Sequence, residues 1–106
     1  EMAAFMAAAE AADWQAPTFA AALVDLGGAN VWPIVSPTFI LLPTNPPGDK
    51  VEASRNTMRF FDWAFKNGDD AARRLEYVPV PDAVAEAVRA AWADVKAPDG
   101  QRVWSA

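Results

Sequence analysis

The chain has 106 residues, of which 53% are hydrophobic and 22% charged, and its net charge is −5. This acidic balance disfavours nucleic acids and anionic membranes as partners, because both are bound through basic surfaces and no basic cluster here exceeds Arg73-Arg74. Histidine and cysteine are absent, which removes the Ser-His-Asp triad, thiol catalysis, disulfides and the commonest zinc ligands. We therefore expect a protein that is not an enzyme and has no cofactor or metal site. No stretch comes near the roughly 20 uninterrupted apolar residues that cross a bilayer.

The first third of the chain predicts one helix followed by less regular structure. Residues 2–12 place apolar side chains at the helical spacing i, i+3, i+4, i+7 and fill most other positions with alanine. The helix should end before Pro17, because the residue before a proline avoids helical angles. Residues 18–26 are apolar at nearly every position, so an irregular segment and a short helix both stay open, closed by Gly27-Gly28.

The segment from Val31 to Leu42 is the most informative in the chain. It is strongly apolar, carries no charge and is interrupted by Pro33 and Pro37. Residues 39–42 have the character of an inner strand of an α/β sheet, covered on both faces. Prolines cannot donate ladder hydrogen bonds, so the first half belongs at an edge, a bulge or a crossing between structural units. Residues 34–38 are therefore a hinge candidate.

The middle of the chain predicts a loop and then a long amphipathic helix. Residues 43–48 combine proline, asparagine and glycine, which is typical of a loop. Asp49 and Glu52 have the spacing of a capping box, so a helix should begin there and continue to about Lys66. Asn67-Gly68 predicts a left-handed stop. The residues expected on the buried face are Val51, Met58, Phe61, Ala64 and Phe65.

The last third predicts two more helices. Residues 69–75 suit a short helix, and residues 77–81 form a rigid extended link because prolines recur in them. Pro81 suits the first turn of a helix that continues to about Lys96, and Asp99-Gly100 suits a turn. The apolar stripe of this last helix consists of Val84, Val88, Ala91, Trp92 and Val95.

One strand and several helices do not make a sheet. A lone central strand has backbone groups without partners on both sides, and buried backbone groups are nearly always hydrogen bonded. The simplest explanation is that the neighbouring strands belong to polypeptide outside this sequence. We therefore expect these residues to be part of a larger protein.

Several short segments between residues 8 and 96, taken in chain order, carry a family resemblance. They are Ala11-Ala12-Asp13-Trp14, Thr18-Phe19, Trp32-Pro33-Ile34 with Ser36, Thr38-Phe39-Ile40-Leu41, Phe60-Phe61-Asp62-Trp63-Ala64, Leu75-Glu76-Tyr77, Pro81-Asp82 with Val84, and Val88-Arg89-Ala90-Ala91-Trp92. Together they resemble the C-terminal third of the phosphate-binding protein of bacterial ABC phosphate importers.

The resemblance implies an α/β fold class: a fragment of a two-lobed periplasmic binding protein (type II-like), helix-rich, with one central strand that runs from the hinge into the core. Residues 1–33 would finish the second lobe, residues 34–38 would be the hinge crossing, and residues 39–106 would complete the first lobe. The implied function is the phosphate-binding component of an ABC phosphate import system in the periplasm. The implied partners are inorganic phosphate, the ABC permease in the inner membrane and the remaining part of the same binding protein.

No ligand-binding residue carries over from the family. Its phosphate-gripping motifs lie earlier in the chain, and among them is a Ser-Gly-Thr loop that this sequence lacks. Only Ser36 and Thr38 are cleft candidates, because their hydroxyls lie on the expected hinge strand. Such hydroxyls more often bond neighbouring backbone. The segment is thus expected to be scaffold and hinge.

The charged clusters have structural interpretations. Asp49-Lys50 opens a helix, where anions bind, but Asp49 would itself cap the free amides. Asp69-Asp70, and Asp82 with Glu86, suit a solvated face, and Arg89 should pair with Glu86 across one helical turn. Five tryptophans are compatible with a stacking platform, but packing in the core is the plainer use. We expect Trp63 and Trp92 in the core and Trp104 partly exposed.

Two other functions stay open. One is a self-contained helical interaction module, in which the stripes Met58/Phe61/Phe65 and Val84/Val88/Trp92 pack on each other or on a partner helix. Such a protein would fold cooperatively without upstream sequence. The other is a binding protein for a different oxyanion, such as molybdate or sulfate, built on the same scaffold.

Overall fold

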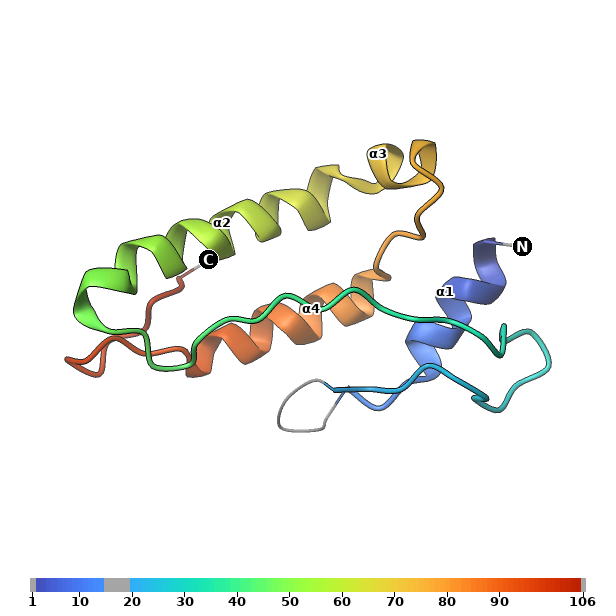
Figure 1. The fold of residues 1–106 in the computed structure, drawn as a ribbon, viewed down its shortest axis with the longest axis horizontal. Helices are drawn as coiled ribbons and strands as arrows, with labels where there is room; N and C mark the ends of the chain where they lie inside the picture. The colour runs from blue at the N-terminus through green and yellow to red at the C-terminus, as the bar shows by residue number, and fades with distance from the viewer. Residues whose placement is uncertain (1, 15–19, 106) are drawn as a thin grey trace.

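The computed structural model describes residues 2–14 and 20–105, and helices dominate these residues (Figure 1). The elements are α1 (Met2–Ala11), the 3-10 turn η1 (Gly48–Lys50), α2 (Val51–Asn67), α3 (Asp69–Arg74), α4 (Asp82–Ala91) and the 3-10 turn η2 (Trp92–Asp94). All four predicted helices are confirmed, with ends that differ by a few residues. Residues 20–26 are irregular rather than helical, and the remainder of the ambiguous 18–26 segment lies outside the described residues.

The strand predicted for residues 39–42 is not formed. This stretch runs extended past α4 in Figure 1, but it has no strand ladder. Among the described residues, the β-pairs are two isolated antiparallel bridges, Val24 with Ile34 and Lys96 with Arg102. A strand exists through hydrogen bonds to a neighbour, and no described segment supplies them to residues 39–42. The fold of this chain by itself is therefore helix-rich.

Both predicted ends of α2 are wrong in detail. Asp49 lies inside η1 and makes no capping hydrogen bond, because the 3-10 turn places the start of α2 beyond it. Glu52 pairs with Arg55 instead of closing a capping box. Gly68 is right-handed, with φ −90° and ψ −9°, and its N–H donates to the Ala64 carbonyl at 2.7 Å. The left-handed stop is absent because α3 begins at the very next residue.

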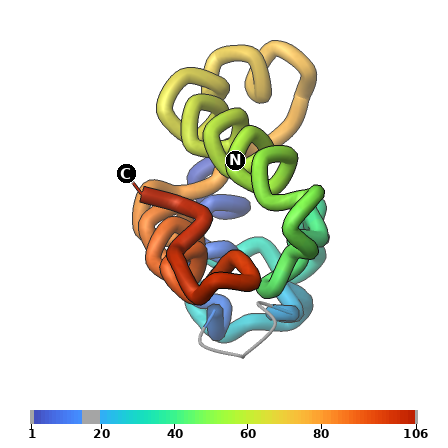
Figure 2. The backbone as a smooth tube through the Cα atoms, turned by 90° about the vertical axis from the view of Figure 1, so that its left-hand side faces the viewer, coloured from blue at the N-terminus to red at the C-terminus, as the bar shows by residue number. Residues whose placement is uncertain are grey.

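The apolar core lies between α2, α4 and the C-terminal tail. Its buried members are Met58 from α2, Trp92 from η2, Val95 directly after η2, and Val103 from the tail. The partly buried residues packed around them are Leu42, Val51, Phe61, Phe65, Val88, Ala97 and Trp104. The stripes predicted for α2 and α4 thus face each other, and Figure 2 shows the tail crossing in front of the space between them.

The tryptophans divide between core and surface. Trp92 is 8% exposed and packs its ring against Phe65 and Trp104, with ring centroids 6.3 and 5.3 Å apart. The predicted partial exposure of Trp104 is confirmed. Trp63, predicted in the core, is 58% exposed. Successive residues of a helix are rotated by 100° about its axis. The five steps from Met58 therefore place Trp63 on the other side of α2.

The N-terminal part forms a second, smaller group of contacts. The Trp32 N–H donates to the Ala4 carbonyl at 3.1 Å, and the rings of Phe5 and Trp32 lie 5.4 Å apart. The Asp25 N–H donates to the Pro33 carbonyl at 2.9 Å. Helix α1 also contacts α4, so this smaller group touches the larger one through these two helices.

The chain is more open than a free-standing domain of its size. Its radius of gyration is 15.2 Å, whereas a compact domain of this length has about 13 Å. Its accessible surface is 7433 Å², whereas a folded monomer of this mass exposes about 5,800 Å². The excess indicates surface that a complete domain would have covered.

Candidate functional site

The two cleft candidates lie on the extended segment between the smaller and the larger group of contacts. Ser36 and Thr38 are both exposed, and they are two residues apart, so their side chains share one face of the extended backbone. Within residues 2–14 and 20–105, neither hydroxyl makes a hydrogen bond. The expected bond to neighbouring backbone is therefore not seen. Their role in a cleft stays a prediction.

The residues that come next in the chain are apolar and also exposed. Phe39 is 48% exposed, Ile40 56% and Leu41 93%. Neighbouring residues of an extended segment point to opposite faces, so both faces are open here. Leu42 alone turns onto the core around Met58. A run of this character on a monomer surface is an unfinished interior or an interaction surface.

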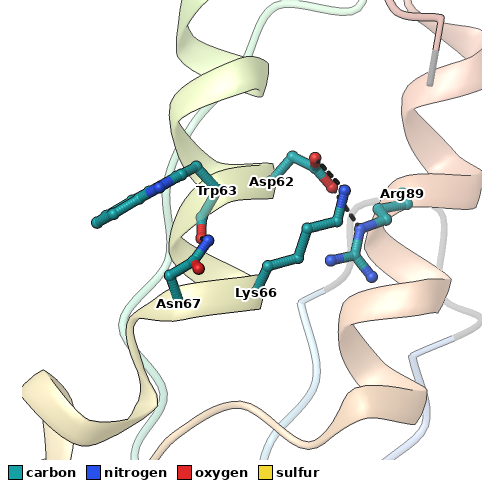
Figure 3. A network of polar contacts seen from close by, with 5 residues as sticks. All are labelled: Asp62, Trp63, Lys66, Asn67 and Arg89. Carbon is teal, nitrogen blue, oxygen red and sulfur yellow. Dashed lines mark hydrogen bonds and ion pairs between the residues drawn. The ribbon is translucent and has the colours of Figure 1, made fainter.

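A polar clasp joins α2 to α4 (Figure 3). Lys66 Nζ and Arg89 Nε each donate to one oxygen of the Asp62 carboxylate, both at 2.7 Å. The Arg89 guanidinium also lies 5.7 Å from the centre of the Phe65 ring. The predicted pair of Arg89 with Glu86 is wrong, because Arg89 is directed at α2 while Glu86 is exposed.

The clasp shifts the titration of its acid. The hydrogen bond from Lys66 lowers the pKa of Asp62 most, and the hydrogen bond from Arg89 and the charges of both bases lower it further, against a partial desolvation that raises it. Asp62 is therefore ionised at neutral pH. With each oxygen already held by a base, its chemical role is to tie two helices together. Sequence spacing could not reveal this pair, because 27 residues separate Asp62 from Arg89.

A surface concavity of about 550 Å³ lies beside the clasp. It is lined by Phe65, Lys66, Asn67, Asp69, Asp70, Asp82 and Arg89. Asp69 and Asp70 lie on a solvated face, as predicted, and Arg73 reaches both of them at 3.4 Å. No trio of acids suited to a metal ion occurs in the described part of the chain. Mixed charges that neutralise one another do not select a ligand.

The remaining features of the described residues do not add a site. Asp49 and Lys50 are exposed, and neither side chain makes a capping hydrogen bond, although Lys50 is the residue before α2. No helix among residues 2–14 and 20–105 is long and apolar enough to pass through a bilayer.

The chain is similar to proteins named as phosphate-binding proteins. It is 39% identical over 102 residues to the phosphate-binding protein PstS of Pasteurella multocida, and 42% identical over 89 residues to that of Haemophilus influenzae. The PstS protein of Xylella fastidiosa is 40% identical over 91 residues. These matches cover 94%, 83% and 84% of the present chain. The resemblance to phosphate-binding proteins is confirmed.

The coverage of the relatives is much smaller. The chain spans 29%, 26% and 24% of the lengths of these three phosphate-binding proteins. The prediction that the sequence corresponds to part of a larger protein therefore agrees with the size of its relatives. No protein-family model matches the chain.

Proposed function

We propose that these residues are the C-terminal part of the phosphate-binding component of an ABC phosphate import system, a periplasmic protein that carries out no chemistry. The observation that carries this proposal is the 38 to 42% identity to PstS proteins over more than four fifths of the chain. The intact protein would hold inorganic phosphate between two lobes and deliver it to a permease in the inner membrane. Hinge closure of two lobes around a ligand is the general mechanism of such proteins.

The segment would act as scaffold and hinge. Residues 1–33 would finish the second lobe, residues 34–38 would cross between lobes, and residues 39–106 would complete the first. One feature supports this division. The contacts of Trp32 with α1 lie apart from the core around Met58, and Ile34, at the start of the crossing, is bridged to Val24 in the N-terminal part.

The phosphate-gripping groups would lie outside this segment. A dehydrated anion needs several fixed donors directed at one point. Among the described residues, four basic side chains are engaged by acids: Arg55, Lys66, Arg73 and Arg89. The other five are exposed rather than fixed in a site: Lys50, Arg59, Arg74, Lys96 and Arg102. Ser36 and Thr38 are hydroxyls near the proposed crossing, and they are the residues of this segment that would approach the cleft.

A chimera tests the proposal. The 106 residues would replace the matching part of the Pasteurella multocida protein, and phosphate binding would be measured by titration calorimetry for the chimera and for the 106-residue chain alone. We expect binding by the chimera and none by the isolated chain. Tight binding by the isolated chain, or a folded chimera that ignores phosphate, would contradict the proposal. Competition with sulfate and molybdate identifies the preferred oxyanion.

A second candidate is the self-contained helical interaction module. One observation favours it: the apolar stripes of α2 and α4 do pack on each other around Met58 and Trp92. The exposed run from Phe39 to Leu41 and the large accessible surface speak against a complete unit. Cooperative unfolding of the isolated chain with no exposed apolar surface would favour the module.

A further inference from the structure

Asn67 and Gly68 form a pair that is open to a covalent change. The chain has four asparagines, and Asn67 is the one that glycine follows. Glycine has no side chain to hinder attack of its backbone nitrogen on the preceding carboxamide. The other three asparagines precede valine, proline and threonine, whose branched side chains or missing N–H oppose this attack. Asn67 is also exposed, so water can reach it.

The passage from α2 to α3 requires this glycine. A Cβ at residue 68 would lie 2.6 Å from the Ala64 carbonyl oxygen, which is closer than van der Waals contact allows. The Gly68 carbonyl also accepts the Ala72 N–H at 2.9 Å, so the same residue starts the hydrogen bonds of α3. The fold therefore demands, at this position, the residue that leaves Asn67 open to attack.

Two hydrogen bonds hold the reacting groups apart. The Gly68 N–H donates to the Ala64 carbonyl at 2.7 Å. Asn67 Nδ2 donates to the Trp63 carbonyl at 2.9 Å, so the carboxamide is directed back along α2 (Figure 3). Side chains of a helix lean toward its N-terminus, whereas the Gly68 nitrogen lies on the C-terminal side of Asn67. Attack therefore requires the last turn of α2 to open.

We propose that Asn67-Gly68 is a latent deamidation site, which the last turn of α2 holds unreactive and which reacts when that turn opens. In the open turn, the Gly68 nitrogen forms a bond to Cγ of Asn67, and the Cγ–Nδ2 bond breaks. The proton of the attacking nitrogen leaves with the amide group as ammonia. Water then opens the succinimide ring at either of its C–N bonds, which gives aspartate or isoaspartate. The sum consumes one water and releases one ammonia, with no oxidation.

The product would weaken the turn that protects the site. The new carboxylate lies at the C-terminal end of α2, where the helix dipole disfavours negative charge, and next in sequence come Asp69 and Asp70 after the glycine. The donor to the Trp63 carbonyl is lost, and isoaspartate also adds a carbon atom to the main chain. Because ammonia leaves, the change is one-way, and it loosens the junction of α2 with α3 as the protein ages.

Ageing at neutral pH tests the proposal. The 106-residue chain, the chimera described above and a synthetic peptide of residues 63–71 would be incubated in parallel. Peptide mapping would measure aspartate and isoaspartate at residue 67, and circular dichroism would show which proteins are folded. We expect the peptide to deamidate and the folded proteins to do so at least about tenfold more slowly. Equal rates in peptide and folded protein, or a peptide that does not react, would overturn the proposal.

A variant of the clasp tests the link to opening of α2. Asp62→Asn removes the carboxylate that holds Lys66 and Arg89 near the end of this helix, so it should speed deamidation by about fivefold. The matched control Glu52→Gln removes an ion-paired carboxylate from the first turn of α2 and should leave the rate unchanged. Asn67→Gln should abolish the reaction at this site. An unchanged rate in Asp62→Asn, or equal acceleration in both carboxylate variants, would refute the protective role of the last turn.

Discussion

Gly68, between α2 and α3, is required by the lack of space for a side chain and not by its backbone angles. Its φ is negative, so replacement by alanine would ordinarily stabilise the chain by lowering the entropy of the unfolded state. However, a Cβ placed there would lie 2.6 Å from the Ala64 carbonyl oxygen. We therefore expect Gly68→Ala to lower the free energy of unfolding by about 1 kcal/mol or more. Gly48→Ala is the control, since its Cβ would meet no atom within 4 Å. Urea unfolding compares them, and a stabilised Gly68→Ala would contradict the packing argument.

The Asp62 clasp makes the stability of the chain depend on pH. Because Lys66 and Arg89 hold the pKa of Asp62 below its usual value, the clasp stabilises the folded chain above about pH 4 and loses this effect as pH falls through the folded-state pKa. At pH 7 we expect Asp62→Asn to lower the free energy of unfolding by about 1 kcal/mol. The loss should disappear in strong acid, where both proteins are neutral at this position.

The matched control for the clasp is Asp70→Asn. Asp70 also faces an arginine, but its side chain is 87% exposed and the contact is 3.4 Å long. Its replacement should change the free energy of unfolding by less than about 0.5 kcal/mol. Urea midpoints measured across the acid range compare the two variants. Similar pH profiles for both would show that the clasp between α2 and α4 contributes no more to the pH dependence of stability than an exposed ion pair does.

At the scale of elements, the pairing of α2 with α4 depends on Met58. This side chain is fully buried at the centre of the core cluster. We expect Met58→Ala to reduce the free energy of unfolding by about 2–5 kcal/mol, because it leaves a cavity. Phe60→Ala removes a larger side chain that is 59% exposed on the same helix, and it should have a far smaller effect. Urea unfolding followed by tryptophan fluorescence measures both, and equal losses would contradict the assigned faces of α2.

The elements also show what sequence can and cannot predict. The stripes through Met58 and Val84 were predictable because buried helix faces repeat every three to four residues. Trp63 was placed on the wrong side because residues 60–65 are apolar at nearly every position and so mark no single face. The partner of Arg89 depends on how two helices meet, which no local spacing contains. For Ser36 and Thr38, the sequence could locate the segment but not the cleft, because a cleft is formed by segments that the fold brings together and local spacing does not contain that arrangement.

At the scale of the whole molecule, the absent strand and the large surface have one explanation. Residues 39–42 have the composition of a buried strand, yet the first three of them are exposed and only Leu42 packs on the core. Composition is local, whereas a strand ladder needs a neighbour. The chain spans 24 to 29% of the length of its phosphate-binding relatives. Under the proposed function, the missing neighbour and the uncovered surface have the same cause, because polypeptide outside these 106 residues would supply both the strand and the cover.

A substitution at Leu41 tests directly whether other polypeptide covers this segment. It is 93% exposed in this chain, so Leu41→Lys should change the free energy of unfolding of the isolated 106 residues by less than about 0.5 kcal/mol. In the chimera the same position would be interior, and an unpaired buried lysine should cost several kcal/mol. Ala53→Lys, on an exposed position of α2, is the control for added charge and should be mild in both proteins. Thermal or urea unfolding of the four variants measures this, and a mild effect of Leu41→Lys in the chimera would show that residue 41 stays at the surface.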